Sequence, residues 1–203
     1  GLELETGKVW VLRKSDKVRI FEEIRTSHPD KVLLVSVECS GKMDLKLWFE
    51  PYNQEGGMEP TEVGIRFFAD AFEMLHCDQK CGVHLEGALK VVTDGETESD
   101  ESGLWIRKCT NVQIYLAMET DFENKDLSDR CMHQIAFARC ISAVQKGAAE
   151  VIRRHEEDIK QFTEGTRLEI EGTDSVSEKI PLMFQYGRYL LFCSSREDSK
   201  LPA

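Results

Sequence analysis

The residues with the most direct potential for chemistry are two cysteines and two histidines in one short segment. Cys77 and Cys81 are separated by three residues and flanked by His76 and His84, and thiolate and imidazole are ligands that Zn²⁺ prefers. Most compact zinc sites use a two-residue gap and a second ligand pair at a regular spacing, which this sequence lacks. We therefore interpret the four residues as reduced cysteines and polar histidines on a hairpin, and we expect neither a metal nor a cofactor.

Two further groups of residues could carry chemistry. His155 and Asp158 lie one turn apart in a helical pattern, so that the carboxylate could orient the imidazole. A surface or interface contact is the favoured interpretation of this pair. Trp48 and Trp105 could stack on a sugar ring if they were exposed, but their apolar neighbours in alternating strands favour core packing for both.

The usual sequence signatures of nucleotide-binding and hydrolase sites are absent. The chain contains no Gly-x-Gly-x-x-Gly, no phosphate-binding loop and no Gly-x-Ser-x-Gly elbow. Its 37 acidic residues could form a glycosidase carboxylate pair in many combinations, so their number identifies none. The residues alone therefore assign no catalytic, cofactor-binding or metal-binding position.

Composition limits the class of partner. The net charge of −11 and the isoelectric point near 5.0 argue against nucleic acid and against an anionic membrane surface. No run of apolar residues approaches the length of a spanning helix. Seven cysteines, an odd number at irregular spacing, favour reduced thiols and a cytoplasmic location, with secretion as the alternative.

Residues 1–120 are predicted to form an antiparallel β-sandwich. Alternating or β-branched segments recur at the 8 to 12 residue spacing that is typical of sandwiches, and no helical pattern interrupts them. The acidic segment 94–102 is predicted to be a solvated hairpin loop. The expected strands are 9–12, 18–24, 31–38, 45–49, 64–72, 88–92, 103–107 and 112–117.

The pattern becomes helical after Asp121. Apolar residues three or four apart predict one long helix over about 126–163 within a linker of residues 121–165, with Asp126 and Ser128 as candidate N-caps and Gly165 near its end. Residues 166–203 are predicted to form a short strand at 167–171 and one further helix that begins near Pro181.

The segment Phe184–Leu191, followed by Ser195-Arg196 and by Pro202-Ala203, resembles a motif of glycoside hydrolase family 95, the bacterial α-L-fucosidases and some α-L-galactosidases. Other parts of the chain are similar to the family as well, among them Leu2–Gly7, Ser27–Asp30, Val63–Phe67, and His155 with Asp158, Phe162 and Arg167–Ile170. The resemblance extends over nearly the whole chain.

The resemblance implies the second half of an N-terminal super-β-sandwich, a linker helix, and a helix that leads into an (α/α)6 barrel. In the family, the barrel hydrolyses terminal α-L-fucosyl or α-L-galactosyl linkages of oligosaccharides with inversion. Because the family's catalytic residues belong to the barrel, none falls on this sequence. The chain is expected to be a non-catalytic portion of such an enzyme, with the barrel of the parent chain as its partner and the oligosaccharide bound through the parent. Arg188 is expected to pair with a carboxylate or carbonyl at the contact between helix and barrel. The alternative is a carbohydrate-binding or scaffolding sandwich without hydrolase activity.

Overall fold

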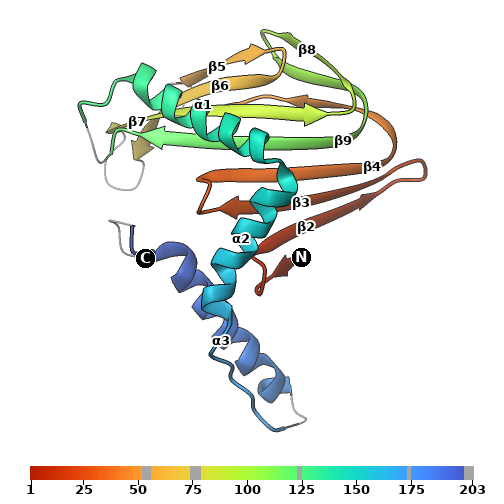
Figure 1. The fold of residues 1–203 in the computed structure, drawn as a ribbon, viewed down its shortest axis with the longest axis vertical. Helices are drawn as coiled ribbons and strands as arrows, with labels where there is room; N and C mark the ends of the chain where they lie inside the picture. Colours follow the sequence, from red (N-terminus) through yellow and green to blue (C-terminus); the bar gives the residue numbers. More distant parts are fainter. Residues whose placement is uncertain (52–55, 74–78, 123–124, 173–174, 199–203) are drawn as a thin grey trace.

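A computed structural model describes residues 1–51, 56–73, 79–122, 125–172 and 175–198 of the chain (Figure 1). These residues contain an antiparallel sheet followed by three helices, which confirms the predicted order of β structure and helices. The strands are β1 (Leu2–Glu3), β2 (Lys8–Lys14), β3 (Arg19–Ser27), β4 (Val32–Leu47), β5 (Gly56–Thr61), β6 (Gly64–Glu73), β7 (Gln79–Thr93), β8 (Glu96–Asp100) and β9 (Gly103–Thr120). The helices are α1 (Asp129–Lys146), α2 (Ala148–Thr163) and α3 (Ser175–Ser194).

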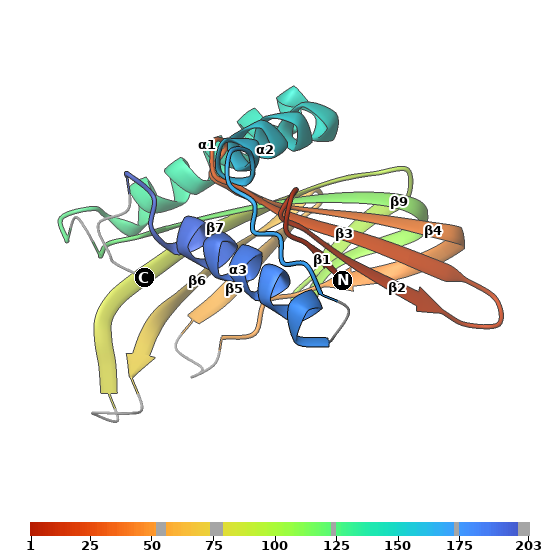
Figure 2. The ribbon, with the colours of Figure 1, turned by 90° about the horizontal axis from the view of Figure 1, so that it is seen from below.

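The nine strands of the described residues pair in the order β1-β2-β3-β4-β9-β7-β6-β5, and β8 pairs with the start of β9. Strands β4 and β9 are long and stay paired along most of their length, from Leu33 opposite Leu116 to Leu47 opposite Leu104. Register shifts interrupt this ladder between Glu38 and Leu45. Such irregularities bend a strand and increase its twist, so the sheet curves (Figure 2).

One face of the sheet is covered by α1. Every fourth residue of this helix is buried, first Met132 and then Ala136 and Cys140, and Ala143 follows three positions later. The small side chains of Ala136, Cys140 and Ala143 pack against Tyr115 and other core residues of the sheet, among them Val32, Leu34, Ala88 and Ala117. Burial of this interface holds α1 flat across β9 and β7 (Figure 1).

The opposite face of the sheet has a second apolar core. The start of β9 supplies Leu104 and Ile106, which are fully buried, and they cluster with Ile65 and Phe67 of β6. Strand β5, at the edge of the sheet, also packs against β8 and β9. The curvature therefore brings two parts of one sheet together in a sandwich-like arrangement.

Asp30 joins the helices to the sheet. Its side chain, in the turn between β3 and β4, is 1% exposed and accepts hydrogen bonds from Lys146 at 2.7 Å and from Arg154 at 3.1 Å. Ser27 donates a further hydrogen bond at 2.9 Å. Burial alone would raise the pKa of Asp30, but the three donors outweigh it and lower the pKa. The segment Ser27–Asp30 therefore has a structural role.

The predicted long helix is two helices, which corrects that expectation. Gly147 ends α1 and begins α2 with φ 81° and ψ 156°, a backbone conformation essentially restricted to glycine. The apolar periodicity continues across this break, so the sequence pattern did not reveal it. Ser128 is the N-cap of α1, and Gly165, with φ 95°, follows the end of α2 as predicted.

Substituting Gly147 by Ala is expected to lower the free energy of unfolding by about 1–3 kcal/mol, because alanine must adopt this strained conformation. No atom lies within 4 Å of the added Cβ, so the effect comes from the backbone alone. Gly187→Ala is the matched control: its Cβ also meets nothing in α3, and alanine should stabilise a helix interior by about 0.5–1 kcal/mol. Urea denaturation of both variants measures the difference, and equal effects would contradict the expectation.

Other local predictions also need correction. Segments 31–38 and 45–49 are one strand, β4, and segments 103–107 and 112–117 are one strand, β9, because irregular residues such as Lys108, with φ 53°, bend the strands without ending them. The acidic segment 94–102 contains the edge strand β8. Residues 167–171 form no strand, since the structure gives them no pairing partner. Helix α3 begins at Ser175, so Pro181 lies inside it. No helix of the described residues is long and apolar enough to cross a membrane.

Candidate functional site at the start of α1

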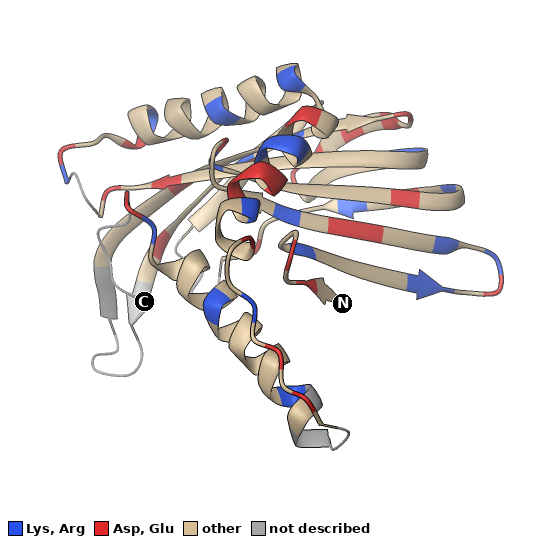
Figure 3. Ribbon diagram, turned by 60° about the horizontal axis from the view of Figure 1, so that its bottom comes forward, with Lys and Arg blue, Asp and Glu red and all other residues tan. Residues whose placement is uncertain are grey.

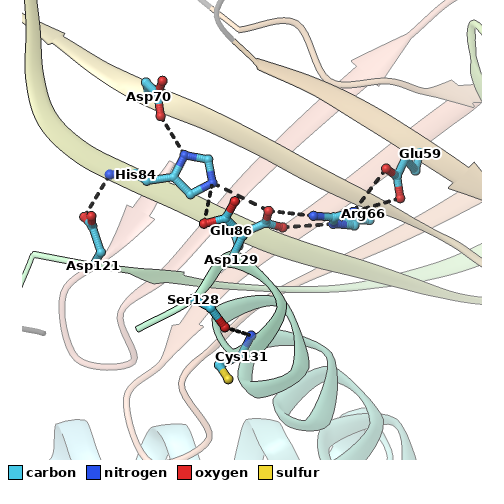
Figure 4. A network of polar contacts seen from close by, with 9 residues as sticks. All are labelled: Glu59, Arg66, Asp70, His84, Glu86, Asp121, Ser128, Asp129 and Cys131. Carbon is cyan, nitrogen blue, oxygen red and sulfur yellow. Dashed lines mark hydrogen bonds and ion pairs between the residues drawn. The ribbon is translucent and has the colours of Figure 1, made fainter. Parts of the chain in front are cut away.

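A cluster of charged side chains lies where β6, β7 and the first turn of α1 meet (Figure 4). Strand β7 supplies His84 and Glu86, which point to the same face because they are two residues apart. Asp70 of β6 lies directly opposite His84 in the ladder, and Arg66 comes from the same strand. Asp129 is the first residue of α1.

Glu86 is buried and bound by one arginine. Its side chain is 1% exposed, and Arg66 donates to both carboxylate oxygens, from Nη2 at 2.7 Å and from Nε at 3.0 Å. Nη1 of Arg66 also donates to both oxygens of the exposed Glu59 at 3.1 Å. The hydrogen bond to Glu86 is the main reason why the pKa of Arg66 is raised. This bidentate hydrogen bonding by one guanidinium stabilises the buried carboxylate.

His84 is held by carboxylates on several sides. Its Nδ1 lies 2.6 Å from Oδ1 of Asp70, and its backbone N–H donates to Asp121 at 2.8 Å. Nε2 lies 3.5 Å from Glu86 and 4.0 Å from Asp129. Burial opposes a charge on the ring, but the hydrogen bond to Asp70 and the charges of Asp129 and Glu86 outweigh it, so the pKa of His84 is raised. The cluster therefore favours a positive charge at Nε2.

The N-cap of α1 fixes the position of Asp129. The side chain of Ser128 accepts a hydrogen bond from the backbone of Cys131 at 3.3 Å, which starts the helix. Asp129 follows in the first turn, where a negative charge interacts favourably with the helix dipole. Its side chain is 70% exposed. A hollow of about 560 Å³, lined by Arg66, Ser128, Asp129, Arg130 and His133, opens beside it.

His155 and Asp158 do not form a pair. His155 is 3% exposed on α2, and its Nε2 donates to the backbone carbonyl of Thr6 at 2.9 Å. Burial, the largest cause, lowers its pKa. Asp158 instead accepts two hydrogen bonds from Arg196, at 2.6 and 3.0 Å. The favoured interpretation as an interface contact is confirmed, because both residues join α2 to other segments.

Trp48, the residue after the end of β4, and Trp105 of β9 both lie outside the core clusters, which corrects the expectation of core packing. Trp48 is 60% exposed, whereas its neighbour Phe49 belongs to the core cluster. Trp105 alternates with the buried Leu104 and Ile106, and its ring lies 5.0 Å from the ammonium of Lys46 and 4.0 Å from the guanidinium of Arg107. The strand period places the apolar neighbours inside and the indoles outside.

The residues singled out from the sequence contribute only His84 to the cluster. The side chains of His76, Cys77 and Cys81 lie outside the described residues. Sequence reasoning missed the cluster's main partners, which are Arg66, Asp70, Glu86, Asp121 and Asp129. One signal was available: His84 and Glu86 are spaced for a common strand face, and Asp129 follows a candidate N-cap.

Cys140 is expected to resist alkylation in the native protein. Its thiol is buried between α1 and the sheet, donating towards the carbonyls of Ala88 and Tyr115, and burial raises its pKa to about 11. Iodoacetamide at pH 8 should therefore modify the exposed Cys131 and Cys193 and leave Cys140 unmodified, because the thiolate is the nucleophile. Peptide mass spectrometry measures this, with urea-unfolded protein as the control. Modification of Cys140 at the rate of Cys131 would contradict it.

Helix α3 docks against α2 through a few side chains. The rings of Phe162 and Phe192 lie 3.7 Å apart, and the guanidinium of Arg196 lies over the Phe192 ring at 3.5 Å. Arg188 donates to the backbone carbonyls of Phe162 and Thr166 at the end of α2. Arg188 thus binds carbonyl oxygens of this chain, whereas the sequence led us to expect a partner at the contact between the helix and the barrel.

Comparison with known proteins places the chain in a family. Residues 1–125 match the family described as "Glycosyl hydrolase family 65, N-terminal domain". The match covers more than half of the chain, and the chain belongs to this family. The resemblance to family 95 is thus supported at the level of a glycoside hydrolase N-terminal domain, and the matching family is family 65.

A solved structure shares the fold. A "putative kojibiose phosphorylase from human microbiome" is similar over 94% of this chain, with a TM-score of 0.63 and 12% sequence identity. This chain spans 27% of the length of that protein. The sequence matches no curated protein significantly.

Proposed function

We propose that this chain is the non-catalytic sandwich and helical linker of a larger glycoside hydrolase, and that the catalytic (α/α)6 barrel of the parent packs against α3. The supporting observation is the apolar surface of α3, where Leu182, Met183 and Leu191 are 61%, 70% and 62% exposed. Figure 3 shows few charged residues along this helix. Several exposed apolar side chains on one helix mark an interaction site. The similar structure is much longer than this chain, which agrees with a further domain.

For the substrate of the parent, we propose oligosaccharides with terminal α-L-fucosyl or α-L-galactosyl groups, hydrolysed with inversion. The motif Phe184–Leu191 of α3, which resembles family 95, supports this class. The parent should release fucose from p-nitrophenyl α-L-fucoside or galactose from the corresponding galactoside. Phosphate-dependent cleavage of kojibiose without either activity would overturn the substrate class and leave the structural role of α3 intact.

The contact between α3 and the barrel can be tested with Leu191→Glu. Leu191 is exposed in residues 1–203, so a glutamate there should leave the stability of this segment nearly unchanged. In the parent, the same change would bury a charge in an apolar interface and should destabilise it by at least about 2 kcal/mol. Leu12→Glu, at an exposed leucine of β2, is the control that should affect neither protein. Equal melting temperatures of the Leu191→Glu and unmodified parents would overturn the proposal.

A carbohydrate-binding module without hydrolase activity is the second candidate, and the exposure of Trp48 favours it. An exposed indole with charged side chains beside it can stack on a sugar ring and donate or accept hydrogen bonds. Millimolar fucosyllactose should then quench the tryptophan fluorescence of residues 1–203, and Trp48→Phe should abolish the quenching while Trp10→Phe should not. Absence of quenching in the unmodified protein would remove this candidate.

A further inference from the structure

The nitrogen Nε2 of His84 is buried and makes no hydrogen bond. The other ring nitrogen, Nδ1, lies 2.6 Å from the carboxylate of Asp70. A carboxylate oxygen accepts, so Nδ1 carries a hydrogen, and in the neutral form of the ring the lone pair is at Nε2. That lone pair faces Glu86 Oε1 at 3.5 Å and Asp129 Oδ1 at 4.0 Å (Figure 4).

We propose that His84, Glu86 and Asp129 bind a divalent transition-metal ion of the class represented by Zn²⁺ and Co²⁺. The three ligand atoms lie within 4.8 Å of one another. Bonds of about 2.0–2.2 Å at tetrahedral angles place ligand atoms about 3.3–3.5 Å apart. The 3.5 Å between His84 and Glu86 already has this value, and the exposed Asp129 carboxylate, 4.0 Å from His84, must move closer to complete the set.

The surrounding residues orient these ligands. The Asp70 carboxylate fixes the ring of His84 in the way that carboxylates support metal-binding histidines. Arg66 holds both oxygens of Glu86 and leaves Oε1 facing Nε2 of His84. Because metal-binding carboxylates are themselves commonly hydrogen-bonded, the Arg66 contact is compatible with binding. The hollow described above borders Asp129, which is the one proposed ligand in its lining.

A proton is the competing occupant of Nε2, because the negative charges that attract a metal ion also favour the protonated ring. The proton and the metal ion differ in what they require of Asp129. A proton needs no movement of Asp129, whereas a metal ion needs Asp129 as a direct ligand. Asp129→Asn is therefore the decisive variant, and because the Asp129 side chain is 70% exposed, the change should leave the fold intact.

The test is a titration of residues 1–203 with Co²⁺ at pH 7.5 under reducing conditions, followed by absorption spectroscopy. We expect one equivalent of cobalt to give the visible bands of a tetrahedral nitrogen and oxygen site, without a thiolate-to-cobalt band in the near ultraviolet. Asp129→Asn should weaken binding at least about 10-fold, and Asp70→Asn about 10- to 100-fold. Asp16→Asn, an exposed acid in the turn between β2 and β3, is the charge-matched control and should bind as the unmodified protein does.

Three results would overturn the proposal. Absence of cobalt binding would leave His84 as a proton site only. A strong thiolate-to-cobalt band would show that cysteine residues bind the ion instead. Binding of equal strength in the Asp129→Asn and Asp16→Asn variants would place the ion elsewhere on the acidic surface. Circular dichroism of each variant confirms that the comparison is made between folded proteins.

Discussion

Replacing Arg66 by Met is expected to lower the free energy of unfolding by about 3–5 kcal/mol, the range found when one partner of a buried ion pair is removed. Met retains much of the volume of the arginine stem but leaves Glu86, 1% exposed, without its two donors. The buried carboxylate has lost its hydration, and the remaining contact with His84, at 3.5 Å, does not replace the two hydrogen bonds from Arg66. Urea denaturation at pH 7 measures the change.

Two further variants separate this effect from a general loss of surface charge. Arg107→Met removes a guanidinium that pairs with the exposed Asp44 and Glu98, and such solvent-screened pairs contribute little to stability. Adding Glu86→Gln to Arg66→Met removes the buried charge, so the double variant should be more stable than Arg66→Met alone. If Arg66→Met and Arg107→Met lowered the free energy of unfolding equally, the Arg66–Glu86 ion pair would stabilise the fold no more than an exposed pair does.

The cluster around His84 could be predicted from the sequence only in part. Alternation along a strand places His84 and Glu86 on one face, and the N-cap Ser128 places Asp129 in a first helical turn. Their meeting depends on the path of the chain from β9 to α1 and on the pairing of β6 with β7. Residue types within one element carry no information on such distant pairings, so Arg66 and Asp70 gave no signal.

The class of fold was predictable because it depends on local periodicity. Strand-length alternation before Thr120 and helical periodicity after Asp129 are both found in the structure. The errors lie where one residue changes the path of the chain, at Gly147 between the helices and at Lys108 within β9. The predicted core packing of Trp48 and Trp105 was wrong for a related reason. Adjacent residues of an extended segment point to opposite sides, so a buried apolar neighbour places the indole outside.

The second large loss of stability is expected at Ile106, in the core that the curvature of the sheet encloses. Its side chain is fully buried in a cluster that also contains Ile65 and Phe67 of β6, a strand that does not pair with β9 because β7 lies between them in the sheet. Ile106→Ala is expected to lower the free energy of unfolding by about 2–5 kcal/mol, through lost apolar burial and the cavity left behind.

Leu12→Ala is the control for Ile106→Ala, because Leu12 is a large aliphatic residue on the same sheet but is 44% exposed. Its effect should stay within about 1 kcal/mol. Urea denaturation of both variants gives the comparison. If Ile106→Ala were as mild as Leu12→Ala, the two parts of the sheet would not share a packed core, and the sandwich-like arrangement would contribute little to stability. A large effect would mean that the bend in β4 and β9, by joining these parts, is a main source of the stability of the fold.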